Sequence, residues 1–187
     1  MRHFFLKASG AVALAAASLA AHAVDGTITI TGAVAATTCT VQVNGGSNSA
    51  TVALPTVGTS SLQGANSFST PVPFSIGVAG CNTNLVSMAP YFESTGSSTF
   101  TAAGRIQTSV TNVDIQILNS AGTPVNLNGS ATVTAGLTGQ SVPVVTLTGT
   151  SPNKTATSNF FARYFSALGS AGSGSISVNL AYTVTYQ

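Results

Sequence analysis

The last fourteen residues of the chain, 174–187, alternate between apolar and mostly polar side chains at strict two-residue spacing. The apolar positions are Ile176, Val178, Leu180, Tyr182, Val184 and Tyr186. Side chains of a β-strand point alternately to its two faces, so the pattern predicts one strand with a face that belongs against a core. Because no later segment follows this strand in the chain, its second neighbour has to come from an earlier segment or from another molecule. The rest of the sequence favours another molecule.

The first 23 residues have the three parts of a secretory signal peptide. Arg2 and Lys7 form the basic start, residues 11–21 form the apolar stretch, and Ala21-His22-Ala23 is a small-x-small cleavage site. The apolar stretch is too short and too rich in alanine to span a bilayer stably. We therefore expect export through the periplasm and a mature chain that begins at Val24.

A second alternating segment lies immediately after the expected cleavage site, before the first cysteine. Ile28, Ile30, Gly32 and Val34 share one face of this segment, and threonines at 27, 29 and 31 share the other. The pattern predicts a strand within an N-terminal arm, residues 24–36, followed by a single domain, residues 37–187. The exported chain is thus expected to begin and to end with a strand.

The net charge of +2 comes from Arg2 and Lys7, which leave with the signal peptide. The charged residues that remain balance to zero; they are Arg105, Lys154, Arg163, Asp25, Glu93 and Asp114. A chain without a basic patch is a poor partner for nucleic acid or for an anionic membrane. Neutral protein surfaces associate readily, so this composition favours self-association.

The composition and the spacing of turn-forming residues favour an antiparallel β-sandwich. The 187 residues are rich in Thr, Val, Ser, Gly and Asn and contain no Trp, and turn signals such as Asn128-Gly129 separate short apolar or alternating runs. Such closely spaced runs are typical of an all-β sandwich rather than of βαβ units. The runs expected to be strands are 39–43, 50–54, 72–78, 89–92, 113–118, 142–147 and 160–165.

The two cysteines, Cys39 and Cys81, are expected to form a disulfide, because the chain is exported and only one pairing exists. Metal binding is disfavoured, since both histidines lie in the signal peptide and the cysteine spacing is not that of a zinc motif. Glu93 and Asp114 form no recognisable acid–base pair, and no histidine remains to activate a serine. We expect no catalytic residues, no metal and no cofactor, and hence no enzyme.

Several segments, in order, resemble the structural pilins of bacterial chaperone–usher pili, particularly the major subunit of type 1 pili. The first is the alternating arm, 26–34, with Gly32 at a small inward position and Cys39 following it. The later segments that carry the resemblance are Val72-Pro-Phe-Ser-Ile-Gly-Val-Ala-Gly-Cys81-Asn-Thr-Asn84, Val113-Asp-Ile-Gln-Ile-Leu-Asn119, Phe160-Phe-Ala-Arg-Tyr164, Gly174 and the penultimate Tyr186.

The resemblance implies an incomplete immunoglobulin-like β-sandwich, the pilin fold, which lacks its seventh strand and is completed by a donor strand from another molecule. It implies that Ile28, Ile30, Gly32 and Val34 form the donor strand. The strand that borders the acceptor groove and binds the chaperone is implied to contain Gly174, Ile176, Val178, Leu180, Tyr182, Val184 and Tyr186. The implied partners are neighbouring pilin subunits in a homopolymer, a periplasmic chaperone and an outer-membrane usher, and the implied location is a fimbria on the bacterial cell surface that supports adhesion.

Three classes of function are compatible with the sequence. A polymerising structural subunit accounts for both ends of the chain, the cysteine pair and the neutral composition; a minor adaptor subunit of the same pilus would share these features. A carbohydrate-binding adhesin is less favoured, because adhesins of this family carry an extra lectin domain and lack a donor arm. A secreted enzyme is the poorest alternative, since it lacks catalytic groups.

Overall fold

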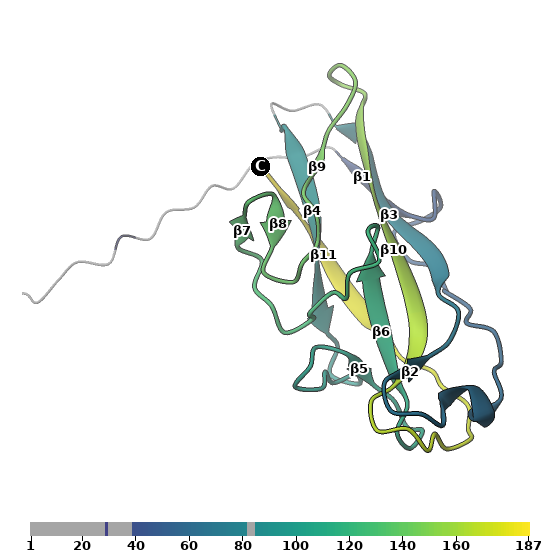
Figure 1. Ribbon diagram of the computed structural model, residues 1–187. Helices are drawn as coiled ribbons and strands as arrows, with labels where there is room; N and C mark the ends of the chain where they lie inside the picture. Colours follow the sequence, from purple (N-terminus) through teal and green to yellow (C-terminus); the bar gives the residue numbers. More distant parts are fainter. Residues whose placement is uncertain (1–28, 30–38, 82–84) are drawn as a thin grey trace, which may run out of the picture. The chain divides into compact units, whose positions relative to one another are not determined.

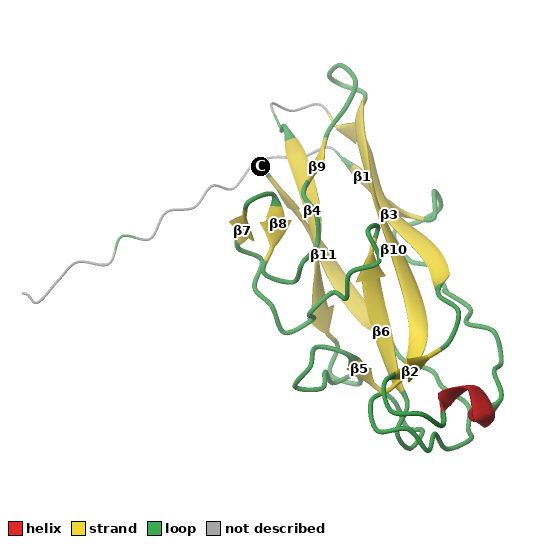
Figure 2. Cartoon of the chain, in the orientation of Figure 1, coloured by secondary structure: helices red, strands yellow, loops and turns green. Residues whose placement is uncertain are grey.

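The computed structural model describes Thr29, residues 39–81 and residues 85–187. The expected signal peptide and, apart from Thr29, the expected arm therefore lie outside the described residues. Within the described part, the regular structure is nearly all strand, with one short 3₁₀ turn, η1 (Thr59–Leu62) (Figure 2). The all-β class expected from the sequence is confirmed.

Two antiparallel sheets form the body of the domain (Figure 1). The larger has the order β1-β3-β10-β6-β5, with β2 paired to β10; its strands are β1 (Thr40–Val43), β2 (Ser67–Phe68), β3 (Val72–Cys81), β5 (Ile106–Gln107), β6 (Asp114–Asn119) and β10 (Lys154–Ser166). The smaller has the order β11-β4-β9; its strands are β4 (Ser87–Ser94), β9 (Val145–Thr146) and β11 (Leu180–Tyr186). A separate hairpin joins β7 (Val133–Thr134) to β8 (Leu137–Thr138).

Strand β10 is the centre of the larger sheet. It pairs with β3, β6 and β2, and its 13 residues alternate between the core and the outer face. Ala156, Ser158, Phe160 and Ala162 are buried, whereas their odd-numbered neighbours are more exposed. The period-two pattern therefore places one continuous face of this long strand against the core.

The two sheets meet through three phenylalanines. The ring of Phe160 on β10 stacks on Phe74 of β3, with centroids 5.4 Å apart, and meets Phe92 of β4 edge-on at 5.1 Å. All three side chains are buried. Burying each ring contributes about 1.5–3 kcal/mol relative to leaving it exposed, so this trio is a main tie between the sheets.

A buried glutamine takes the place of a strand beside part of β4. β9 pairs only with Ser87 and Met88, the first two residues of β4. Farther along β4, the side chain of Gln140 bonds to the backbone of Phe92. Its Oε1 accepts from the Phe92 N–H at 2.9 Å, and its Nε2 donates to the Phe92 carbonyl at 2.7 Å and to the Leu127 carbonyl at 3.0 Å. The fully buried amide thus satisfies three backbone groups that would otherwise lack a partner.

Close contact between two loops brings Gln140 to this position. A Cβ built on Gly129 would lie 2.1 Å from the carbonyl oxygen of Gly139, so neither loop could approach the other if Gly129 carried a side chain. The sequence marks Asn128-Gly129 as a turn, but nothing in it indicates that this turn packs against Gly139.

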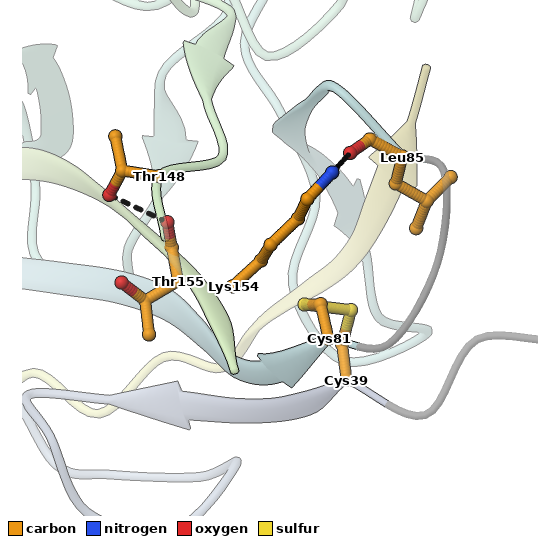
Figure 3. Close-up of a disulfide and its surroundings, with 6 residues drawn as sticks. All are labelled: Cys39, Cys81, Leu85, Thr148, Lys154 and Thr155. Atoms are coloured by element: carbon orange, nitrogen blue, oxygen red, sulfur yellow. Dashed lines mark hydrogen bonds between the residues drawn. A yellow bond between two sulfur atoms is a disulfide. The ribbon is translucent and has the colours of Figure 1, made fainter. Parts of the chain in front are cut away.

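The disulfide expected from the sequence is present, and it joins the start of β1 to the end of β3 (Figure 3). Cys81 is fully buried in a cluster with Val78, Met88, Leu147 and Ala156. Close by, the Lys154 ammonium donates to the Leu85 carbonyl at 2.9 Å. The bond therefore ties the first strand of the described domain to the end of β3.

Several strands differ from the expectation. The run 142–147 forms a strand only as β9 (Val145–Thr146), and the run 160–165 is part of the longer β10. The C-terminal strand pairs from Leu180 and not from Gly174, because its neighbour β4 ends at Ser94, which lies opposite Leu180. Residues 174–179 keep the alternating burial without a sheet partner among the described residues. The run 50–54, expected as a strand, likewise has no ladder, although Val52 and Leu54 pack on the core.

We predict that replacing Cys39 and Cys81 together by alanine lowers the free energy of unfolding by about 3–4 kcal/mol, because the disulfide closes a loop with a sequence separation of 42 residues. Denaturant unfolding of the oxidised chain and of the variant measures the difference. Reducing agent should destabilise the native chain by a similar amount and leave the variant unchanged. Equal stability of the two chains would contradict the prediction.

We also predict that Gln140→Leu destabilises the domain by about 2–5 kcal/mol, since a buried N–H and two carbonyls lose their partner. Thermal and denaturant unfolding provide the measurement. Gln107→Leu is the matched control: Gln107 is exposed, and its substitution should change stability by less than about 1 kcal/mol. A Gln140→Leu chain as stable as this control would show that the amide is not structurally required.

Candidate strand-binding groove

Strand β11 is bonded on one side. It pairs with β4 over seven register positions, from Leu180 opposite Ser94 to Tyr186 opposite Met88, and β4 is its only partner among the described residues. The backbone N–H and C=O groups of Gln187 both bond to Ser87. In an antiparallel ladder every second residue turns its backbone groups the other way, so those of Tyr182, Val184 and Tyr186 point to the outer edge.

The inward face of the C-terminal segment is incompletely covered. Its six apolar side chains from Ile176 to Tyr186 are all half-buried, whereas inward residues of the central strand, such as Phe160, are fully buried. Ser175, Ser177 and Asn179 on the opposite face are exposed. The chain thus directs an apolar face toward the core without enough material to bury it.

A groove of about 600 Å³ lies beside this segment. One wall is formed by Ile176, Val178, Leu180 and Tyr182, and the facing wall by residues 48–54. Its floor belongs to the core and consists of Val43, Phe74, Ile76, Phe92, Ile106, Ile115, Ile117, Ala162 and Tyr164. None of the described residues that line the groove is charged, so the site suits an extended apolar segment and offers no partner to an ion.

A hydrogen bond connects the two walls of the groove. The Tyr182 hydroxyl on β11 donates to the Asn48 carbonyl at 2.7 Å. The facing wall follows β1 through a tight turn in which the Val43 N–H bonds to the Ser47 carbonyl. Val52 and Leu54 on this wall are half-buried, like the residues across the groove. Both walls therefore present apolar side chains to the same space.

The structure brings together only part of the residue set expected from the sequence. Ile176, Val178, Leu180 and Tyr182 line the groove, while Val184 and Tyr186 continue the same edge and pack on the cluster around the disulfide. Gly174 is not among the lining residues; a Cβ on it would lie 2.9 Å from Val110, so it permits a close approach of two loops. Ile28, Ile30, Gly32 and Val34 lie outside the described residues.

Sequence reasoning missed the wall formed by residues 48–54 and the floor residues Ile106 and Ile115. The alternation of Val52, Leu54 and their polar neighbours was a signal for an extended segment, but it could not show that the segment faces β11. Such a pairing across the molecule depends on tertiary contacts.

The described residues contain no group of three or more His, Cys, Asp or Glu side chains that could hold a metal. The one ion pair in this part of the chain joins Arg105 Nε to Asp114 Oδ2 at 2.9 Å, on β6 and the loop before β5. Glu93 accepts a hydrogen bond from the Thr183 hydroxyl at 2.9 Å, beside the outer surface of β11. These carboxylates therefore have structural partners and lie apart from the groove lining.

No helix long and apolar enough to cross a bilayer is found in the described part of the chain.

The fold and the groove together define a class of protein: an immunoglobulin-like β-sandwich with an open edge beside its C-terminal strand.

The family follows from sequence comparison. The model of the fimbrial protein family matches residues 28–187, and the chain belongs to this family. It is 35% identical over 178 residues to the major fimbrial subunit SMF-1 of Stenotrophomonas maltophilia (strain K279a). This alignment covers 92% of this chain and 99% of SMF-1. It is 34% identical over 180 residues to the F17 fimbrial protein of Escherichia coli, covering 92% and 93% of the two chains.

The fold is also that of a solved pilin. The crystal structure of the P pilus rod subunit PapA superposes with a TM-score of 0.56 at 16% identity, covering 79% of this chain and 99% of PapA. This likeness confirms the pilin fold expected from the sequence. Membership of the fimbrial family makes the chain a structural subunit of surface fimbriae and not an enzyme, as expected.

The two tyrosines of the C-terminal strand predict a loss of stability at alkaline pH. Burial raises the pKa of Tyr182 and of Tyr186 above the ordinary tyrosine value. A raised pKa means that the folded state favours the neutral phenol, so the free energy of unfolding is highest below about pH 10 and falls as the pH rises through the folded-state pKa.

A Tyr182→Phe/Tyr186→Phe double variant should therefore lose less stability than the native chain between about pH 9 and 11. Denaturant unfolding at several pH values measures this slope. The missing bond to Asn48 should lower the stability of the variant at neutral pH, so the test compares slopes and not absolute values. Parallel curves for the two chains would contradict the prediction.

Proposed function

We propose that the chain polymerises by donor-strand complementation: the arm of one copy, residues 24–36, lies along β11 of another copy and fills its groove. The observation that supports this proposal best is the outer edge of β11, which has no ladder partner among the described residues and borders an apolar groove of about 600 Å³. An open edge with apolar side chains is a template for strand addition and an aggregation hazard unless it is covered.

The arm has the chemistry that this groove requires. Ile28, Ile30 and Val34 share one face and offer apolar side chains at strand spacing, while the backbone supplies the donors and acceptors for a ladder. Burying the three side chains contributes about 1.5–3 kcal/mol each. Gly32 lies on the same face and suits a place where the groove is shallow or the two backbones approach closely.

The route to the filament follows from the same physical problem. Before assembly the groove would be exposed, so we propose that a periplasmic chaperone lends a strand to the edge of β11. At an outer-membrane usher the arm of the next copy replaces that strand. This route requires the signal peptide, residues 1–23, and a domain that begins near residue 37 and receives the donor strand. Val184 and Tyr186 extend the edge that the chaperone would bind.

The decisive experiment deletes residues 24–34 from the mature chain. The groove residues are unchanged, so the deleted chain should still be captured by the chaperone, but it should not cap a preceding subunit. A synthetic peptide of residues 24–36 should bind the deleted chain and raise its thermal stability. Electron microscopy and unheated gel electrophoresis detect filaments, and calorimetry detects peptide binding.

The matched control is the same peptide with Ile28→Asp and Ile30→Asp, which keeps the backbone donors and the length but not the apolar side chains. It should bind far more weakly, because two charges would enter an uncharged groove. Normal filaments formed by the deleted chain would refute the donor-strand mechanism.

A further inference from the structure

Two exposed apolar side chains lie at opposite ends of the sandwich. Val86 is 62% exposed and precedes β4, near the disulfide; Leu168 is 78% exposed and follows β10. The Val86 N–H bonds to the carbonyl of Gln187 at the end of β11, so Val86 marks the end where β11 finishes. We call the surroundings of Cys39, Cys81 and Val86 the disulfide end, and the surroundings of Leu168 the Leu168 end.

The Leu168 end contains a hollow of about 520 Å³ lined by Arg105, residues 107–114, Ala167 and Leu168. Val110 and Val113, two of its lining residues, are buried and pack with Leu62 and Ala171. Ile176, on the wall of the groove, packs against the same cluster. The hollow and the end of the groove where the C-terminal segment begins therefore border the same buried cluster.

The loop that carries Leu168 is held in place. Gly169 has a φ of +76°, and a Cβ on it would lie 2.3 Å from the Gln63 carbonyl oxygen, so the turn after Leu168 packs directly on the loop that follows η1. The Ser170 N–H also bonds to the Gln63 carbonyl at 3.1 Å. Leu168 is thus an exposed apolar side chain presented by an anchored turn beside a hollow.

The polarity of strand insertion decides which surface meets the Leu168 end, and this step rests on the proposed function. If the arm lay parallel to β11, its last residues would leave the groove at the disulfide end of the acceptor. The disulfide end of the donor would then lie at the disulfide end of the acceptor. Every copy would have both of its neighbours at this one end, and a filament could not extend. Antiparallel insertion, the pairing of every ladder in this domain, places the end of the arm at Ile176 and joins successive copies head to tail.

The length of chain between the arm and the domain limits how far apart the two copies can be. Val34 and Cys39 are separated by five residue steps, which span at most about 17 Å when fully extended. With Val34 at the Ile176 end of the groove, the disulfide end of the donor copy has to lie close to the Leu168 end of the acceptor.

We infer that Val86 of one copy packs against Leu168 and the adjacent hollow of the preceding copy, forming a second contact between the neighbours that the donor strand joins. The contact buries two apolar side chains that a single copy leaves in water. An apolar side chain can enter the hollow without burying an unpaired charge, because Arg105 and Asp114 on its wall form an ion pair. The partner is a second copy of this chain.

The experiment places a photo-crosslinking phenylalanine analogue at position 168 in assembled filaments. Illumination should link position 168 to the peptide that contains Val86 of the neighbouring copy, as identified by mass spectrometry. The matched control carries the analogue at position 137, because Leu137 is also exposed, at 42%, but lies on β8. It should give no link to that peptide.

A reciprocal variant with the analogue at position 86 should link to the peptide around Leu168. As a functional measure, Leu168→Asp should make filaments dissociate at lower denaturant concentration, and adding Val86→Lys should restore the native value. Links from 168 to another surface, or none, in filaments that form normally would overturn this contact and leave the donor-strand proposal intact. A native chain that forms no filament would instead contradict the proposed function.

Discussion

The one-sided bonding of β11 is the constraint on which the rest of the structure depends. Its seven register pairs with β4 fix the strand in the smaller sheet, and the alternation of the ladder then turns its remaining backbone groups outward. The alternation along residues 176–186 directs six apolar side chains toward the core, where they remain half-buried. The backbone of β11 thus lacks hydrogen-bond partners along the same edge where its apolar side chains lack cover. One additional strand would provide the hydrogen bonds and bury these side chains.

The contrast with the other side of β4 shows that this open edge is localised. There the short strand β9 ends early, but the Gln140 amide continues the pairing by bonding both backbone groups of Phe92. The phenylalanine trio fills the core between the sheets, and the disulfide ties the start of β1 to the end of β3. The core and the far side of β4 are therefore closed in the described part of the chain, whereas the outer edge of β11 borders an apolar groove.

Charge plays little part in this arrangement. The described residues that line the groove carry no charge, and the ion pair of Arg105 and Asp114 lies on the wall of a different hollow. Recognition in the groove would then rest on backbone hydrogen bonds and apolar burial, which are weakened little by salt. A fimbrial subunit that works outside the cell gains from such contacts, since they do not depend on a controlled ionic environment.

The sequence by itself determined the fold class, the disulfide and the amphipathic C-terminal strand, because period-two alternation and a single cysteine pair are local signals that survive without knowledge of the fold. It also indicated the arm from Ile28 to Val34, which apart from Thr29 lies outside the described residues. Only the tertiary structure decided where pairing of the last strand begins, that residues 48–54 form the facing wall, and that Gln140 completes β4. Each of these features depends on contacts between segments far apart in the chain. The residues of one segment do not specify which distant segment it will contact.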